Sequence, residues 1–405
     1  MTDALKARDA KDVEDAVRWA LAEGKTLEVA GRGSKRLLGR PSQSDLTLDL
    51  SGLSGVTLYE PEELVLSAKA GTPIAEIEAL VASRGQQLAF EPMDYGPVLG
   101  GSAGAGSLGG ALATNLSGPR RIKAGAARDH FLGFSAVSGR GEAFKSGGRV
   151  VKNVTGYDLC KILAGSFGTL AAMTDVTIKT LPAPETETTV LVPGLDDAKA
   201  NAAMSAAMAS SCDVSGAAHL PRKMVMHIKG VYLVHAATAF RLEGVAPSVK
   251  HRVDALKSLL SSFGASEQIT GDESRNFWRG VRDAVPLAAS AATGDWPLWR
   301  VSTTPALGAE FAASLPRDAQ FFFDWAGGLV WVALPSADDA GAGAIRRAAH
   351  STGGHATLIR APAAIRAAVD VFEPQKGALA GVSKRIKEGF DPKGVLNPGR
   401  MWAGV

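Results

Sequence analysis

The stretch GGSAGAGSLGGALATNLSGPRR, residues 100–121, decides how this sequence is interpreted. Eight of the 46 glycines fall between residues 96 and 118, a density that lets backbone approach a ligand closely. Gly104–Gly109 reads G-x-G-x-x-G, but a nicotinamide site needs a strand directly before that pattern. The preceding FEPMDYGPVLGGSA is rich in Pro and Gly and predicts no strand, so a classical dinucleotide fold is disfavoured.

The same stretch still suits a phosphate ligand. A helix that starts near Ser107 would aim backbone N–H groups at an anion. Thr114, Asn115 and Ser117 follow with polar atoms that can bond the edge of a polar ring. The alternative for these three residues is plain helix termination before Gly118.

Two further segments carry candidate chemistry. Gly31–Arg36 follows a strand predicted at 26–31, and its glycines, hydroxyl and cations suit a pyrophosphate. A surface turn with solvated charges is the alternative interpretation. Residues 147–181 place Asn153, Tyr157 and Asp158 before a helix at 158–165 and a strand at 175–181. A helix–turn–strand unit of the core explains that third segment equally well.

Composition excludes several classes of protein. The 405 residues carry 44 basic and 41 acidic side chains, a net charge of +3 that argues against a nucleic-acid binder. Two cysteines cannot ligate an iron–sulfur cluster alone and predict a reducing compartment. The N-terminus has no signal-peptide core, and no window reaches the roughly 18 apolar residues of a membrane helix. We expect a cytoplasmic protein, with any association with the inner membrane peripheral.

Periodicity predicts the other elements. Helices are expected at 11–23, 248–263 and in the tail up to about 387, and another is expected at 72–84 with Thr72 as its cap and Pro73 at its first position. Strands are expected at 46–50, 56–60, 64–71 and 231–240, and a β-hairpin at 321–334. The two prolines at 182 and 184 mark a linker, after which the pattern is α+β without dense glycine.

Taken together, five motifs resemble a known family. GRGSK (31–35), GSLGGALATNLSGPRR (106–121), KNVTGYDLCKILAGSFGTL (152–170), VTIKTLP (176–182) and DPKGVLNPGRM (391–401) resemble flavoproteins related to vanillyl-alcohol oxidase. Within that family, SGPRR with KNVTGYD is most similar to the smaller flavin subunits of bacterial glycolate oxidases. The resemblance implies an α+β fold, with a p-cresol methylhydroxylase-type FAD-binding domain at 1–182, an inserted α+β cap at 183–361 and a tail at 362–405 that returns to the FAD domain.

The resemblance also implies the cofactor and the residues that hold it. The first loop would hold the FAD pyrophosphate, the second segment would continue to the isoalloxazine ring, and the third would contact the adenine side. The implied residues are Arg32, Gly33, Ser34, Lys35 and Arg36; Gly106, Ser107, Gly109, Gly110, Thr114, Asn115, Ser117 and Gly118; and Gly168, Ala172 and Ile178. Because Lys35 and Arg36 stand where some relatives have a linking His, FAD should be bound noncovalently.

Catalysis is less determined by the sequence. The His-rich run of close relatives is missing, none of the seven histidines makes a clear ligand pair, and we assign neither a catalytic residue nor a metal site. The resemblance implies a glycolate (2-hydroxyacid) oxidase complex with a homologous flavin subunit and an iron–sulfur subunit that passes electrons to quinone. The alternatives are a self-sufficient FAD-dependent 2-hydroxyacid dehydrogenase and a non-catalytic flavin-bearing assembly subunit. We expect little turnover of glycolate by the isolated chain.

Overall fold

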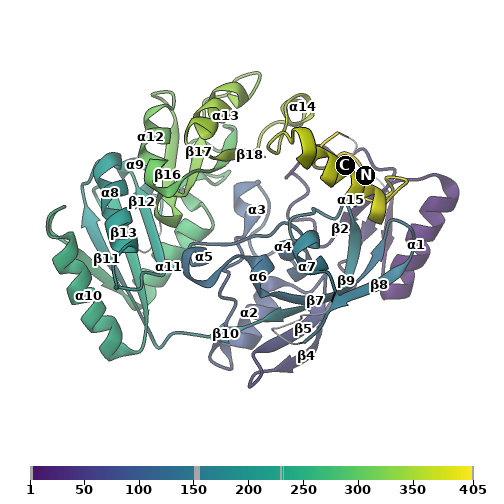
Figure 1. Cartoon of the computed structure of the whole chain (residues 1–405), viewed down its shortest axis with the longest axis horizontal. Coiled ribbons are helices and arrows are strands. Elements are labelled where there is room, and N and C mark those ends of the chain that lie inside the picture. Colours follow the sequence, from purple (N-terminus) through teal and green to yellow (C-terminus); the bar gives the residue numbers. More distant parts are fainter. Residues whose placement is uncertain (1–2, 150–155, 229, 231, 404–405) are drawn as a thin grey trace.

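The structure is a computed structural model that describes residues 3–149, 156–228, 230 and 232–403. The KNVT part of the third motif, residues 152–155 with Asn153, lies outside the described residues. Figure 1 shows two parts: the eight-stranded sheet with its helices on the left, and the smaller sheets on the right, with α3 (Tyr95–Val98) and α5 (Arg121–Ala124) between them.

The smaller sheets are built by the first 182 residues. A parallel three-stranded sheet has the order β1-β3-β2, and an antiparallel five-stranded sheet has the order β4-β5-β9-β7-β8. Their strands are β1 (Ala4–Lys6), β2 (Leu27–Ala30), β3 (Leu46–Asp49), β4 (Val56–Glu60), β5 (Val65–Lys69), β7 (Phe131–Ser138), β8 (Ala143–Gly147) and β9 (Ala171–Lys179). Helix α1 (Ala10–Glu23) buries Val13, Val17 and Ala20 in an apolar cluster that both sheets contribute to, as its 3.6-residue period predicts.

The larger sheet has the order β14-β11-β13-β12-β16-β17-β15-β18 and antiparallel pairing throughout. Its strands are β11 (Thr186–Pro193), β12 (Gly216–Leu220), β13 (Ala237–Gly244), β14 (Glu267–Thr270), β15 (Leu298–Ser302), β16 (Gln320–Asp324), β17 (Leu329–Ala333) and β18 (His355–Arg360). All eight lie between residues 183 and 361. The domain division at 182 and 361 itself stays a prediction.

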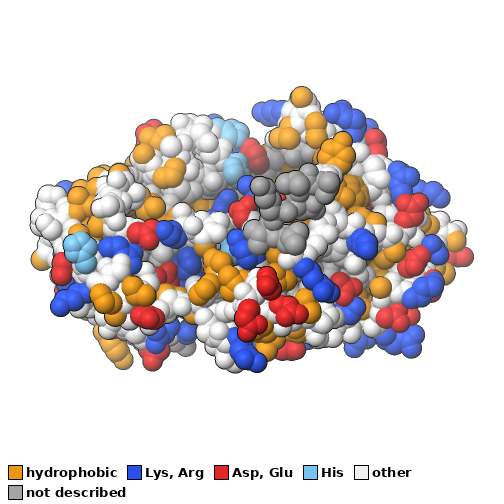
Figure 2. All heavy atoms as spheres, turned by 60° about the horizontal axis from the view of Figure 1, so that its bottom comes forward, with side chains coloured by type: hydrophobic (Ala, Val, Ile, Leu, Met, Phe, Trp, Pro, Cys, Tyr) orange, Lys and Arg blue, Asp and Glu red, His pale blue; other side chains and the backbone are white. Residues whose placement is uncertain are grey.

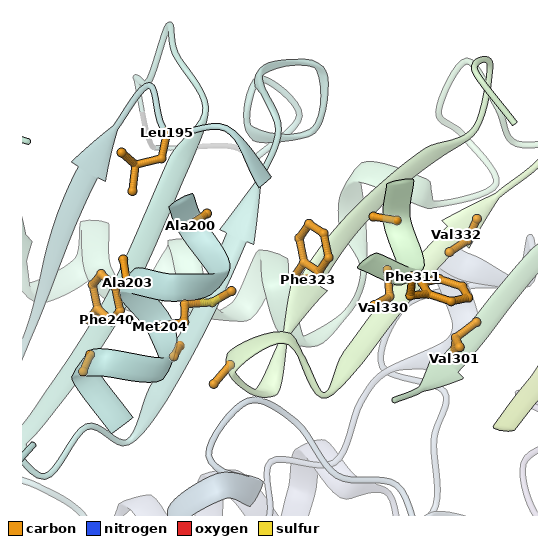
Figure 3. Packing of buried hydrophobic residues seen from close by; sticks show 14 of the residues in the cluster. Leu195, Ala200, Ala203, Met204, Phe240, Val301, Phe311, Phe323, Val330 and Val332 are labelled. Carbon is orange, nitrogen blue, oxygen red and sulfur yellow. The ribbon is translucent and has the colours of Figure 1, made fainter. Parts of the chain in front are cut away.

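Strand alternation gives the larger sheet two buried faces. Val330 and Val332 of β17 pack into a cluster under α8 (Asp197–Met208), α10 (Ala246–Leu260), α12 (Gly308–Ala313) and α13 (Ala342–Ser351). Figure 3 shows part of that cluster, with Ala203 of α8 near Phe240 of β13. The neighbouring Trp331 packs on the opposite face with α11 (Gly271–Arg282) and with Tyr95 of the N-terminal half. This second face therefore joins the two parts of the molecule.

The C-terminal tail returns to the smaller sheets. Leu396 forms a parallel bridge with Leu27 of β2. The buried Asp391 carboxylate accepts hydrogen bonds from Val395 N (2.9 Å), Leu396 N (2.8 Å) and Lys387 Nζ (2.6 Å). In Figure 1 the tail helix α15 (Gly377–Phe390) lies on the right, in the same part as α1.

The other elements are short. They are α2 (Ile74–Ala82), β6 (Gln86–Gln87) paired with β10 (Leu181–Pro182), α4 (Leu108–Ala113), α6 (Ala127–His130), α7 (Leu159–Leu163), α9 (Arg222–Val225), α14 (Ala363–Ala368), and the 3₁₀ turns η1 (Val285–Leu287), η2 (Pro305–Leu307) and η3 (Trp325–Gly327). No helix among the described residues is long and apolar enough to span a membrane. On the face drawn in Figure 2, basic and acidic side chains are interspersed, in keeping with the small net charge.

Two sequence expectations need correction. Thr72 does not cap α2; Pro73 takes that position, and the Thr72 hydroxyl donates to Lys69 O at 2.7 Å instead. The strand expected at 231–240 begins only at Ala237, because the apolar residues before it are exposed, Tyr232 by 95% and Val234 by 66%. The β-hairpin expected at 321–334 is confirmed by the pairing of β16 and β17.

Candidate functional site

The first cavity is built mainly from backbone. It lies between the loop after β2, the start of α4 and the turn at Phe167–Gly168. Space is tight here: a Cβ on Gly109 would lie 2.8 Å from Ala70 O, one on Gly31 would lie 2.6 Å from Ser107 Oγ, and one on Gly110 would lie 3.1 Å from the same hydroxyl. These positions leave backbone exposed to the cavity that any larger side chain would cover.

The ammonium group of Lys35 lies close to this glycine backbone. Lys35 Nζ lies 3.4 Å from where a Cβ of Gly110 would be, and its hydrogen-bond acceptor among the described residues is Ser34 Oγ at 3.2 Å. Burial lowers the pKa of Lys35 to about 8, and Asp94 opposes that shift. A partly buried ammonium without a close carboxylate suits a phosphate group, which would restore its charge.

The tail fixes the same loop from behind. Arg400 donates to Lys35 O at 2.9 Å and to Arg36 O at 3.2 Å. Asn397 accepts from Val29 N at 2.9 Å and donates to Phe167 O at 2.8 Å. The NPGR part of the tail motif therefore shapes the wall of the first cavity.

The structure brings most of the sequence-predicted residues together. The first cavity is lined by Arg32, Gly33, Ser34, Lys35, Arg36, Ser107, Gly109, Gly110, Thr114 and Gly168. Thr114 also lines a second cavity, together with Asn115, Ser117 and Gly118. Gly106 lies at the rim, where a Cβ would be 3.9 Å from Lys35 Nζ. Ala172 and Ile178 line neither cavity; both are fully buried in apolar clusters beneath the sheets.

The second cavity has a volume of about 590 Å³ and lies between the second segment and the larger sheet. One face of that sheet lines it because the strand register aligns alternate residues. Arg300 of β15 pairs with Trp331 of β17 and with Thr357 of β18, and Ser302 pairs with His355. Since successive residues alternate faces, all five side chains stand on the cavity side.

Two guanidinium groups face this cavity, and neither has a carboxylate within salt-bridge distance among the described residues. Arg121 lies 4.3 Å and Arg300 4.8 Å from the centroid of the Trp325 ring. Within the described part of the chain, neither forms a salt bridge, although both line the cavity. Burial, the largest cause, lowers the pKa of each, and both stay charged because an arginine titrates far above neutral pH. Their N–H donors are available to an anion.

An acid and a base stand in the same cavity. Burial raises the pKa of Asp324 to about 7, although its Oδ1 accepts a hydrogen bond from Trp325 N at 2.7 Å. Partial desolvation, with the Arg300 and Arg121 charges, lowers the pKa of His355, although the residue is exposed at the cavity mouth and the Glu373 charge opposes the shift. His355 is therefore neutral at pH 7 and can accept a proton.

Sequence reasoning missed three of these groups. Arg300, Asp324 and His355 come from separate strands and match no motif, and Arg121 stands out only as the last residue of the SGPRR motif. The available signal was weak: Arg300 is the single charge in the strand LWRVS, and Asp324 follows three phenylalanines. Charged side chains are almost never fully buried unless they are paired.

Comparison with known proteins shows the family of this chain. The family described as FAD binding domain matches residues 4–147. The chain is 32% identical over 397 residues to glycolate oxidase subunit GlcE of Escherichia coli K12, covering 96% of each chain. The chain belongs to the GlcE family. It is accordingly an FAD-dependent oxidoreductase, and FAD is its cofactor.

Other relatives share parts of the chain or its fold. Glycolate oxidase subunit GlcD of Bacillus subtilis is 30% identical over 151 residues, 37% of this chain and 30% of that protein. The structure of p-cresol methylhydroxylase with substrate bound has a TM-score of 0.71 at 13% identity, over 98% of this chain and 88% of that one. An alkyldihydroxyacetonephosphate synthase has a TM-score of 0.66 at 17% identity, over 98% and 75%. These likenesses confirm the α+β fold with a p-cresol methylhydroxylase-type FAD-binding domain.

Proposed function

We propose that this chain is the FAD-binding subunit of a glycolate oxidase complex and that its second cavity binds the carboxylate of a 2-hydroxy acid. The observation that carries the proposal concerns the guanidinium groups of Arg121 and Arg300. Both line the cavity that adjoins the FAD-binding segment, and neither forms a salt bridge among the described residues. The GlcE and GlcD relatives support glycolate, which is oxidised to glyoxylate, as the substrate.

In this proposal the first cavity holds the phosphate side of FAD. Lys35 and the backbone of Gly31–Arg36 and Ser107–Gly110 bind the pyrophosphate, and Thr114–Gly118 lead to the flavin ring. Gly31 and Gly110 fit the group because a Cβ at either position would close the cradle. Noncovalent binding is supported by Cys160 and Cys212, which are buried and line neither cavity.

The substrate is handled by side chains of the second cavity. FAD, when bound, supplies the acceptor for the hydride that leaves C2. Arg121 and Arg300 bind the carboxylate and orient C2, which converts binding energy into alignment. Neutral His355 accepts the hydroxyl proton as the C2–O bond becomes a carbonyl. Asp324, when protonated, adds no negative charge near the anionic substrate.

The complex and its location complete the proposal. A homologous flavin subunit and an iron–sulfur subunit accept electrons and pass them to quinone, since two cysteines cannot hold a cluster. The protein acts in the cytoplasm, with contact to the inner membrane only through partners. The word subunit in the name of the GlcE relative supports an assembly.

A second candidate function is a flavin-bearing assembly subunit in which the partner oxidises the substrate. The missing His-rich run favours it. The two candidates differ in a single measurement, anaerobic addition of glycolate to the purified, flavin-loaded chain. Bleaching of the flavin absorbance that is lost in Arg300→Met supports substrate oxidation here. Unchanged flavin absorbance at millimolar glycolate would support the assembly role.

A further inference from the structure

A closed ring of buried charges joins the second segment to the larger sheet. Glu91 accepts hydrogen bonds from both terminal nitrogens of Arg241 on β13, at 2.9 and 3.0 Å. Arg120 lies 3.0 Å from Glu91 Oε1 and also binds Glu243, with distances of 3.0 Å from Nε and 2.7 Å from Nη2. The four side chains are between 1% and 12% exposed.

These four charged side chains are buried, so they differ from ordinary solvent-exposed ion pairs. Burial alone would raise the pKa of Glu91, but Arg241 and Arg120 hold it below its usual range. Replacing a buried ion pair as a whole can leave stability unchanged, whereas removing one member leaves its partners unpaired. What such a ring supplies is a fixed relative position of the groups that it joins.

The ring fixes the backbone that leads to Arg121. Glu91 Oε2 accepts from Arg120 N at 2.6 Å, and Phe90 O accepts from Gly118 N at 2.9 Å. A Cβ on Gly118 would lie 2.7 Å from Glu91 Cβ, so the two segments are in direct contact. Arg121 follows immediately, which leaves its backbone little freedom.

The larger sheet holds the same turn from the other side. Trp325 Nε1 donates to Gly118 O at 3.0 Å, and its ring contacts the guanidiniums of Arg121 and Arg300. Consecutive arginines thus divide two roles: Arg120 fastens the turn to the sheet, and Arg121 enters the second cavity. Glu91 itself lines a different polar cavity, of about 370 Å³, with Arg120 and Arg241.

We propose that Glu91 is a positioning residue that acts through Arg120 to set the place of Arg121 against Trp325. The inference rests on the proposed function, because the place of Arg121 matters only if the second cavity binds a carboxylate. Glu91 does not line that cavity and therefore acts indirectly.

The test uses the flavin-loaded full chain and oxalate, a dicarboxylate that cannot be oxidised by hydride loss. Oxalate binding is followed by the change in flavin absorbance. Glu91→Gln should retain flavin and weaken oxalate binding about 10- to 100-fold, the effect of a misplacement near 1 Å. Glu185→Gln is the control, because Glu185 lines the same 370 Å³ cavity and forms no ion pair among the described residues. Glu91→Asp should recover part of the affinity.

A double-mutant cycle separates positioning from general damage. In an Arg121→Met background, Glu91→Gln should change oxalate affinity less than twofold, because the group that it positions is gone. Additive effects of the two substitutions would overturn the inference while leaving the proposed function intact. If Arg121→Met alone binds oxalate as the unaltered protein does, both are overturned. If Glu91→Gln fails to fold with flavin, Glu243→Gln removes the other partner of Arg120 and enters the same cycle.

Discussion

The two cavities of this protein are made in different ways. The first is backbone, a glycine loop and a helix start that lie within residues 31–36 and 106–114, closed by the tail. The second is lined mainly by side chains, which come from the turn at 114–121 and from the strands β15, β16, β17 and β18. The first has little room for added side chains at several of its glycines, whereas the second depends on which charged groups the sheet register aligns.

The largest expected effect belongs to the backbone cavity. Gly110→Val places branched carbon atoms against Ser107 Oγ and Lys35 Nζ, where even a Cβ would lie at 3.1 and 3.4 Å. We expect the purified variant to retain no flavin. Its absorbance at 450 nm, relative to that at 280 nm, should therefore be about zero. Exposed Asp295→Ala is the control and should retain full flavin. A flavin-replete Gly110→Val protein would contradict the assignment of the first cavity.

The next effect belongs to the side-chain cavity and should leave flavin in place. Arg300→Met keeps an unbranched apolar stem and removes the guanidinium. Loss of charge-assisted hydrogen bonds worth about 1.5–3 kcal/mol predicts a fall of roughly 10- to 150-fold in oxalate affinity or in the rate of flavin reduction by glycolate. Exposed Arg317→Met should change neither. If Arg300→Met loses flavin instead, the two cavities are not separable in the way that the comparison requires.

A smaller effect should appear as a pH dependence. Asp324 has a pKa of about 7 because burial disfavours its charged form, so raising the pH from 6 to 8 creates a carboxylate in the cavity. That carboxylate repels the anion and attracts Arg300, so oxalate affinity should fall as the pH rises. The expected fall is on the order of tenfold, because two like charges in one cavity repel each other at an effective dielectric constant far below that of water.

The control for this pH dependence is Asp324→Asn, which should bind oxalate almost equally at pH 6 and 8. Lys35, with a pKa of about 8, also titrates in this range, but it lies in the first cavity and is unchanged in the variant. A dependence that persists in Asp324→Asn would assign it to Lys35 and thus to the backbone cavity.

The difference between the cavities also explains what the sequence predicts. The first cavity is formed largely by two short continuous segments, Gly31–Arg36 and Ser107–Gly110. Their glycines can be recognised directly in the sequence. Arg300 and His355 line the same cavity only because β15 and β18 pair with one definite register, and a shift of β18 by one residue would turn His355 to the opposite face. The fold was predicted because its motifs are local; the second cavity was not, because its residues are joined by tertiary pairing alone.

The C-terminal tail contributes to the backbone cavity although it lies far from the other lining segments in the sequence. A substitution in the tail gives the smallest of the predicted effects. Asn397 has a positive φ of 45° and bonds both Val29 N and Phe167 O. Asn397→Gly keeps that conformation accessible and removes both bonds, so the free energy of unfolding should fall by about 1–3 kcal/mol. Thermal denaturation followed by flavin release measures this, with exposed Gln43→Gly as the control for the entropy that glycine adds to the unfolded chain. Oxalate affinity should stay unchanged, because Asn397 lines only the first cavity. A variant with unaltered stability but weaker oxalate binding would mean that the tail acts on the side-chain cavity and that the two regions are coupled through it.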